Sequence, residues 1–294
     1  MKTAFAKYRL RMETPFNILI HKVNKIVFGI QTADKLKWIK HSNSLKKKYF
    51  KDEIWNFNGI RLPDYKPDPT GWLMYSIYMD TLFVFCNHKD DYNCILIDKL
   101  DNYLIDGTYG YKNNNIDVTV KKNDIVIDAG AWIGDFSAYA AFKGAKVYAF
   151  EPCKNTIEYL KKTEELNQNI QIIEKGLGDK NCKSYLSNNN SNSVSNKITE
   201  NSVDSEVIEI ITLDDFVTEN NIEKIDFIKA DIEGYERYML LGATEVLKKL
   251  CPKLAICTYH FPDDPEVLAR IILEANPNYK IVQKRKKLYA MVKS

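Results

Sequence analysis

The sequence predicts an α/β fold with a seven-stranded, mainly parallel sheet that ends in an antiparallel hairpin. From residue 117 onward, short apolar runs alternate with longer helical patterns. Continuous apolar strands separated by helices indicate a parallel sheet that is covered on both faces. Only four residues, Lys284 to Lys287, separate the last two runs. Because that distance is too short for a crossover helix, these two runs must pair antiparallel.

The N-terminal third predicts a different structure, a mainly helical and basic region. Its first 51 residues have helical spacing, with a break at Pro15 and a second helix from Ala33 to Tyr49. Asn58-Gly59 and the cluster of Pro and Gly residues after it indicate irregular chain. Trp72 to Asn87 fits either a helix or a strand. We therefore expect a helical N-terminal extension over residues 1–105 and a second domain over residues 106–294.

The second domain contains the regular alternation. The predicted strands are Ile125–Ala129, Lys146–Phe150, Ile170–Glu174, Asp226–Ala230, Lys253–Thr258, Tyr279–Gln283 and Leu288–Val292. The helical patterns between and after them are Ile133–Lys143, Cys153–Asn167, Tyr235–Leu250 and Asp264–Ala275. Ser187 to Ser202 interrupts this order with six Asn and five Ser among 16 residues. Such a segment buries little apolar surface, so it predicts a mobile loop or an exposed hairpin tip on the ligand side of the sheet, or else disordered filler.

Composition excludes several classes of protein. The chain has 294 residues, of which 45% are apolar and 28% charged, which is ordinary globular composition. Six cysteines without a C-x-x-C pair and four histidines argue against a disulfide scaffold and a structural zinc site. Lysines and other polar residues interrupt the most apolar early stretch, Phe16 to Ile30, so it is too short for a membrane span. No export signal is visible, and we expect a cytoplasmic protein with reduced thiols.

Charge is distributed unevenly along the chain. Residues 1–51 hold 13 Lys or Arg and two acids, a net charge of +11, whereas the remaining chain carries a net charge of −8. The simplest interpretation is a solvated helical face. The functional interpretation is attraction to an anionic acceptor or to an anionic membrane surface, with peripheral contact and no transmembrane segment.

The strand ends predict where chemistry occurs, because ligands bind outside the carboxyl ends of parallel strands. The first strand runs into a glycine turn, Asp128 to Gly134, and the second ends in Glu151-Pro152. The third is followed by Gly176-Leu177, the fourth by Asp231 to Gly234, and the fifth by His260. A dinucleotide site would carry G-x-G-x-x-G so that backbone amides meet a pyrophosphate. Here the turn is D-x-G-x-x-x-G, and its carboxylate favours a ligand with an amino group and a sulfonium, S-adenosylmethionine, with Glu151 accepting the ribose hydroxyls.

At these positions the sequence resembles the FkbM-type family of class I methyltransferases. The resemblance rests on residues 126–134, 147–152 and 226–236, with Gly242-Ala243 after them, and it extends from Asp106 to Val292. The K-x-D-x-E-G-x-E block at 229–236 is its most specific part. The resemblance implies a Rossmann-like class I fold, S-adenosylmethionine as methyl donor, and O-methylation of a small molecule or glycan. Trp132 stands where the family commonly has Asn or His, so contacts at that position do not carry over.

Site residues follow from the strand ends and from this resemblance. Asp231, Glu233 and His260 are the catalytic candidates. His260 is the best base by its ordinary pKa, and the alternative is a structural histidine beside Asp263. A divalent ion at Asp231, Glu233 and Glu236 stays open, but salt bridges or helix capping explain these acids more simply, and we predict no metal. The cofactor-binding candidates are Asp128, Gly130, Ala131, Trp132, Gly134, Asp135, Phe136, Ser137, Glu151, Pro152, Gly176, Leu177 and Asp231.

Four aromatic residues near these strand ends have two interpretations. Trp132, Phe136, Tyr109 and Tyr111 are candidates for stacking on adenine or for facing the sulfonium. Aromatic residues are equally common in hydrophobic cores, so a core position is the alternative for each of them.

The sequence therefore predicts an S-adenosylmethionine-dependent O-methyltransferase. Its acceptor would be a hydroxyl of a sugar, a nucleotide-linked precursor or a surface-glycan component, and an anionic one. Only the basic N-terminal stretch supports the alternative of nucleic-acid methylation. Asp231-Ile232-Glu233-Gly234 stands where base-amine methylation calls for Asn/Asp-Pro-Pro-aromatic, so a nucleic-acid partner is not favoured. A second alternative is a non-catalytic module that docks a membrane or a partner, and the intact cofactor-site acids argue against it.

Overall fold

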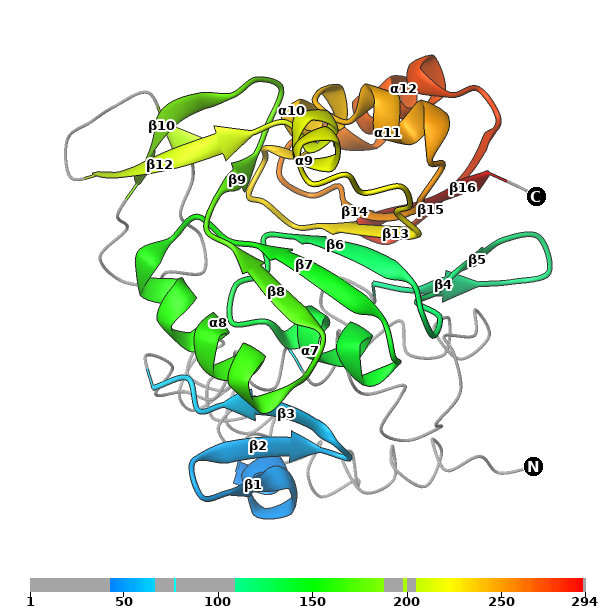
Figure 1. The fold of residues 1–294 in the computed structure, drawn as a ribbon. Helices are drawn as coiled ribbons and strands as arrows, with labels where there is room; N and C mark the ends of the chain where they lie inside the picture. The colour runs from blue at the N-terminus through cyan, green and yellow to red at the C-terminus, as the bar shows by residue number, and fades with distance from the viewer. Residues whose placement is uncertain (1–42, 67–76, 78–108, 188–197, 200–204, 293–294) are drawn as a thin grey trace, which may run out of the picture.

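A computed structural model describes residues 43–66, 77, 109–187, 198–199 and 205–292 (Figure 1). The first predicted helix, most of the second and nearly all of the Trp72–Asn87 stretch lie outside these residues. The described end of the second helix, residues 43–49, is helical as expected. No helix among the described residues is long and apolar enough to cross a membrane.

The central sheet has the seven predicted strands. They are β6 (Ile125–Ala129), β7 (Lys146–Phe150), β8 (Ile170–Ile173), β13 (Phe227–Ala230), β14 (Lys253–Cys257), β15 (Tyr279–Lys284) and β16 (Lys287–Val292). Their spatial order is β15-β16-β14-β13-β6-β7-β8. Strand β16 pairs antiparallel with both β14 and β15, and the other pairings are parallel, which confirms the predicted fold class. The order reverses beside β6, and such a switch point is where open sheets bind ligands.

Alternate residues of these strands bury into two separate cores. Val126 of β6 faces the first core, which contains Phe136 and Leu160, and Ile127 faces the second, which contains Leu240 and Leu268. The first core lies under α7 (Asp135–Phe142) and α8 (Lys154–Leu166). The second lies under α9 (Leu213–Glu219), α10 (Glu236–Leu241), α11 (Thr244–Lys249) and α12 (Asp264–Ala275), on the opposite face in Figure 1. Burial on both faces explains why the strands are apolar runs without alternation.

The predicted single helix over Tyr235–Leu250 is wrong, because the structure divides it into α10 and α11. The break is at Gly242, where an added Cβ would overlap the carbonyl oxygen of Gly178. The Gly242 carbonyl accepts a hydrogen bond from Asp214 N at the start of α9 instead of continuing a helix. A close backbone approach between distant segments thus overrides a helical pattern that is regular in the sequence.

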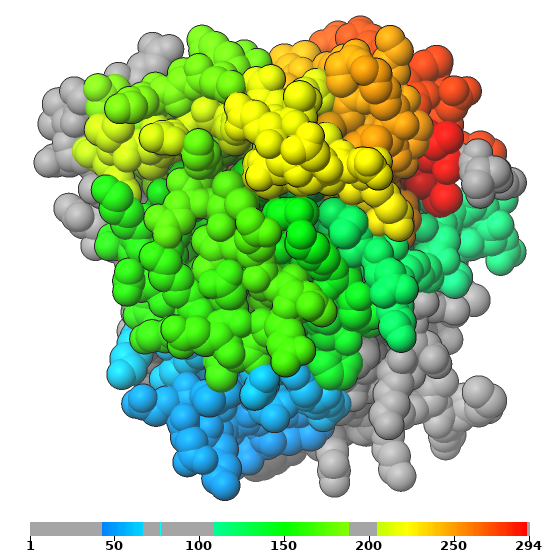
Figure 2. Space-filling view, in the orientation of Figure 1, coloured from blue at the N-terminus to red at the C-terminus, as the bar shows by residue number. Residues whose placement is uncertain are grey.

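The prediction of irregular chain around Asn58-Gly59 is also wrong. These two residues form the turn of a hairpin, with φ of 57° and 109°, between β2 (Ile54–Phe57) and β3 (Ile60–Pro63). An Asn-Gly pair with positive φ at both positions is the preferred two-residue hairpin turn. Strand β1 (Phe50–Lys51) completes a three-stranded antiparallel sheet. This sheet packs against α7 and α8, and Figure 2 shows it directly against them.

Two smaller sheets complete the fold. The first has the order β11-β10-β12-β9, from β9 (Gly176–Leu177), β10 (Cys182–Ser187), β11 (Ile198–Thr199) and β12 (Ser205–Ile211). Ser187 pairs with Ser205, and Ile198–Thr199 within the Asn- and Ser-rich segment pairs with β10. The rest of that segment, for which a mobile loop or an exposed hairpin tip was expected, lies outside the described residues. The second sheet pairs β4 (Tyr111–Lys112) with β5 (Asp117–Val118). Neither sheet was predicted from the sequence.

Candidate active site

The turn after β6 is held by two glycines in left-handed conformations. Gly130 has φ of 72° and Gly134 has φ of 85°. A Cβ on Gly130 would overlap the carbonyl oxygen of Asp231, which follows β13. The N–H groups of Gly130 and Ala131 both donate to the Phe150 carbonyl at the end of β7. The turn therefore lies tightly between the ends of its two neighbouring strands, as a ligand-binding turn at the switch point requires.

Asp128 is completely buried beneath this turn. Its Oδ2 accepts a hydrogen bond of 2.6 Å from Ser137 Oγ, and its Oδ1 lies 3.0 Å from Lys229 Nζ. Lys229 also donates 2.6 Å to the Gly130 carbonyl. Burial lowers the pKa of this lysine, but the carboxylates of Asp128, Asp231 and Asp135 outweigh that effect and raise it. The ammonium is thus charged and joins β13 to the glycine turn.

Glu151 extends from the end of β7 to the other side of the turn. Its Oε2 accepts 2.9 Å from Trp132 N, and its Oε1 accepts 3.0 Å from Cys153 N. Burial raises the pKa of Glu151 to about 7, although both backbone hydrogen bonds and Lys229 oppose the shift. Since each carboxylate oxygen can accept two hydrogen bonds, each retains capacity for a further donor.

The remaining cofactor candidates divide into backbone positions and core side chains. Trp132 has φ of 48°, and its ring packs edge-on against Tyr65 at 5.1 Å. Its Nε1 has no hydrogen-bond partner among the described residues. The Phe136 ring lies in the core against Tyr109 and Phe227. Asp135 begins α7, Gly176 lies beside Pro152, and Leu177 belongs to the second core.

The alternative that some aromatic residues belong to the core holds for two of the four. Phe136 is one, and Tyr111 is the other, since its ring stacks on Tyr289 at 5.2 Å and is buried. Tyr109 has a different place, because its hydroxyl donates 2.6 Å to Asp231 Oδ2. Burial, followed by the Asp231 charge, raises the pKa of Tyr109, so it stays a neutral donor.

The catalytic candidates meet at the ends of β13 and β14. Tyr259 donates 2.8 Å to Asp231 Oδ1, so two tyrosines fix this carboxylate. His260 Nε2 lies 3.8 Å from Asp231 Oδ1 and 3.6 Å from Glu233 Oε2. Burial opposes ionisation of Asp231, yet Lys229, Lys287 and the Tyr109 hydrogen bond lower its pKa. The structure therefore brings all three catalytic candidates together.

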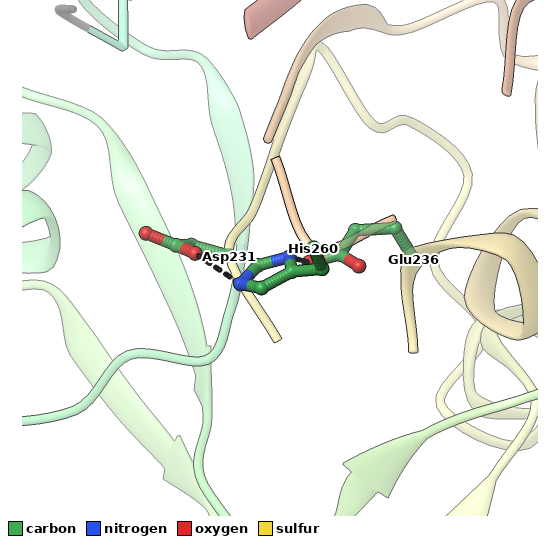
Figure 3. Close-up of side chains that lie close together, drawn as sticks. All are labelled: Asp231, Glu236 and His260. Atoms are coloured by element: carbon green, nitrogen blue, oxygen red, sulfur yellow. Dashed lines mark ion pairs between the residues drawn. The ribbon is translucent and has the colours of Figure 1, made fainter. Parts of the chain in front are cut away.

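Glu236 faces the other nitrogen of His260, as Figure 3 shows. Its Oε1 is 3.1 Å from Nδ1, and its two oxygens accept hydrogen bonds from Ile232 N and Gly234 N. Burial lowers the pKa of His260, but Glu236, Asp231 and Glu233 together raise it. The alternative partner, Asp263, instead pairs with Arg237, so the proposed contact between His260 and Asp263 is replaced by one with Glu236.

Three parts of this site were not predicted from the sequence. The first is the role of Lys229, although a lysine inside a buried strand needs a partner and is itself a signal. The others are the tyrosine pair on Asp231 and the position of Lys287, whose Nζ lies 4.3 Å from the Tyr109 ring centre. Tyr109 and Lys287 are far from Asp231 in the sequence, so no local pattern could indicate these contacts.

The seven-stranded sheet with its terminal antiparallel hairpin is the fold of a class I methyltransferase. The sequence pattern of the methyltransferase FkbM domain matches residues 128–283. The chain belongs to the FkbM methyltransferase family.

Two known proteins illustrate the similarity. Hexuronic acid methyltransferase AglP of Haloferax volcanii is 27% identical over 169 residues, covering 55% of this chain and 67% of that protein. The crystal structure of an FkbM methyltransferase from Methylobacillus flagellatus KT is 18% identical, with a TM-score of 0.47, and the match covers 88% of this chain. The chain matches 60% of the length of that structure.

Proposed function

We propose that this protein is an S-adenosylmethionine-dependent O-methyltransferase that acts on a hydroxyl of a sugar or glycan precursor. The observation that carries the proposal is the Glu151 carboxylate beside the glycine turn, at the switch point of a sheet in a methyltransferase family. The sugar acceptor is supported by the name of the relative AglP, a hexuronic acid methyltransferase.

The residues around the turn fit such a donor. Glu151 would receive the two ribose hydroxyls on the free lone pairs of its oxygens, since each oxygen accepts only one backbone N–H. Asp128 would support the donor site from beneath the glycine turn. Its side chain is buried, and its oxygens face Ser137 and Lys229. When bound, the donor supplies an electrophilic methyl group on a sulfonium.

Asp231, Glu233 and His260 would form the side of the site that faces the acceptor, which we call the acceptor edge. The donor would supply the methyl group, with its sulfur keeping the electron pair of the broken bond, and Asp231, Glu233 or His260 would orient the acceptor hydroxyl and receive its proton. Correct alignment can supply about 7–11 kcal/mol, whereas proton removal contributes ~10²–10⁴-fold. The main task of the edge is therefore to orient the acceptor.

An anionic acceptor remains part of the proposal. Lys46, Lys47, Lys48 and Lys51 are exposed on the described end of the basic stretch, where an anion or a membrane surface could reach them. A solvated face explains the same exposure. The two interpretations differ in how KM for the acceptor responds to salt. If the lysines capture the acceptor, KM for a soluble acceptor rises with ionic strength, because the Debye length is about 10 Å at 0.1 M salt.

The donor site can be tested with Glu151→Ala. Loss of charge-assisted hydrogen bonds, worth ~1.5–3 kcal/mol, should weaken S-adenosylmethionine binding by about 10–100-fold in calorimetry. The wild-type affinity should also fall as pH falls through about 7, because a protonated Glu151 cannot accept both hydroxyls with full charge. The variant should lose this pH dependence.

Unchanged affinity and unchanged pH dependence in Glu151→Ala would remove the donor assignment. Glu174→Gln, an exposed acid paired with Lys161, is the control for the change in charge. Incubation with labelled donor and a panel of neutral and acidic sugars then tests the acceptor class, and label on a nucleic acid instead would contradict it.

A further inference from the structure

His260 has a buried side chain whose Nε2 makes no hydrogen bond with any described residue. The side chain is 4% exposed, and Glu236 Oε1 lies 3.1 Å from its other nitrogen, Nδ1. A buried polar atom ordinarily finds a partner, so the unsatisfied Nε2 requires an explanation. Its Nε2 points between two carboxylates that are themselves partly exposed, Asp231 at 22% and Glu233 at 26%.

The spacing around Nε2 is that of ligands around an ion. Two atoms about 2.1–2.2 Å from a shared cation lie roughly 3.0–3.8 Å apart at ordinary coordination angles. The distances from Nε2 are 3.6 Å to Glu233 Oε2 and 3.8 Å to Asp231 Oδ1. Both are too long for hydrogen bonds and fall within the range that two ligands of one ion require.

Glu236 completes the arrangement from behind. Its carboxylate lies close enough to Asp231 and His260 for the three side chains to bind one ion. However, Glu236 faces Nδ1 of the His260 ring, whereas Asp231 faces Nε2 (Figure 3). One ion is held by one nitrogen of a ring, and the Glu236 oxygens already accept two backbone N–H groups. Glu236 therefore has the place of the outer carboxylate that orients a ligating histidine.

Asp231 is oriented in advance in the same way. Tyr259 donates to its Oδ1 and Tyr109 to its Oδ2, and each oxygen retains a lone pair. Ligating carboxylates are typically fixed by such outer hydrogen bonds. The carboxylate thus faces Nε2 without reorganisation of the side chain.

We propose that Asp231, Glu233 and His260 Nε2 form a divalent metal site that holds the acceptor oxygen. The inference rests on the proposed function, because the ion would orient the acceptor beside the donor, and Nε2 would then be a ligand rather than a proton acceptor. A set of one nitrogen and two carboxylates suits Mn²⁺, Fe²⁺ or Zn²⁺ better than Mg²⁺, which retains waters in oxygen-rich sites. A six-coordinate ion would have three positions left, and two of them would suit adjacent sugar oxygens.

The test titrates Mn²⁺ into the full chain and follows the paramagnetic resonance signal of the free ion. We expect one bound Mn²⁺ per chain. Asp231→Asn and His260→Gln should each weaken binding by at least about tenfold. Glu245→Gln, which removes an exposed acid paired with Lys249, should leave binding unchanged. Glu233→Gln is the variant to use if His260→Gln does not fold, because Glu233 is partly exposed.

Weak Mn²⁺ binding by the wild type, at millimolar concentration only, would overturn the metal site. Equal binding by all variants would overturn it as well. Calorimetry with S-adenosylmethionine on the same samples separates the two proposals. Donor binding without Mn²⁺ binding removes the metal site and leaves the methyltransferase proposal, whereas Mn²⁺ binding without donor binding does the reverse.

Discussion

Gly130 shows how a single residue connects the two halves of the site. Its positive φ turns the chain after β6, and its missing side chain lets the turn touch the Asp231 carbonyl. The proposed donor side and the proposed acceptor side therefore lie in direct backbone contact. Any side chain at this position would push the glycine turn away from the end of β13.

We expect Gly130→Ala to destabilise the fold and to abolish donor binding. The left-handed conformation alone costs an alanine on the order of 1–3 kcal/mol, and the overlap with a backbone oxygen adds to that cost. Gly144→Ala is the matched control. It has a similar φ of 88°, but the nearest atom to its Cβ would be in the flexible Lys122 side chain, at 3.1 Å, and the nearest backbone atom would be at 3.8 Å. Urea unfolding should show a larger loss for Gly130, and equal losses would contradict the proposed contact.

The sequence predicted which charged residues meet at the strand ends better than it predicted their contacts. Glu151, Asp231 and His260 were identifiable because strand ends meet at one edge of a parallel sheet. The burial of Asp128 could not be identified in the same way, since it depends on the contact with Lys229. The partner of His260 could not be identified either, since helix packing decides between Asp263 and Glu236. Contacts between elements thus decide what each residue does.

Among the elements, β6 and β13 depend on a buried ion pair. Lys229 and Asp128 are 4% and 0% exposed, and their Nζ and Oδ1 atoms are 3.0 Å apart. Because the Lys229 ammonium also contacts the Gly130 carbonyl, it aligns the ends of two strands that are 100 residues apart in the sequence.

We expect Lys229→Met to destabilise the protein by about 3–5 kcal/mol, since it leaves the Asp128 charge buried without its partner. The double variant Asp128→Asn/Lys229→Met should recover part of that loss. Lys161→Met, in the exposed pair with Glu174, should have little effect. Urea unfolding of the wild type, of Lys229→Met, of Asp128→Asn and of the double variant measures this coupling, and additive losses in the double variant would refute it.

Element boundaries were predictable where burial alone determines them. The strands of the central sheet are continuous apolar runs, and β6 and β7 have the predicted bounds. Prediction failed at Gly242 and at Asn58-Gly59, where a tertiary approach and a hairpin turn outweigh the local pattern. The small sheet of β9 to β12 was missed because its paired segments are short or half-exposed.

At the scale of the whole molecule, the N-terminal sheet is packed onto the methyltransferase fold. Ile60 and Leu62 of β3 are fully buried and belong to the same core as Leu160 of α8. Asn167, at the end of α8, donates 2.7 Å to the Arg61 carbonyl and accepts 3.3 Å from Arg61 N. The described part of the N-terminal region thus covers α7 and α8. These two helices lie on the face of the central sheet that is beneath the glycine turn.

Because β1 to β3 pack on α7 and α8, the domain boundary expected at residue 105 can be tested. If β1 to β3 stabilise the methyltransferase fold, Ile60→Ala should lower its stability by about 2–5 kcal/mol, the usual cost of a buried aliphatic truncation. Loss of donor binding and loss of helical signal should then occur in one transition at lower urea. Val207→Ala, at a position 54% exposed, is the control and should change little. An unchanged donor-binding transition in Ile60→Ala would instead show that the N-terminal sheet folds as an independent unit, because a separate domain would lose its structure without affecting the glycine turn.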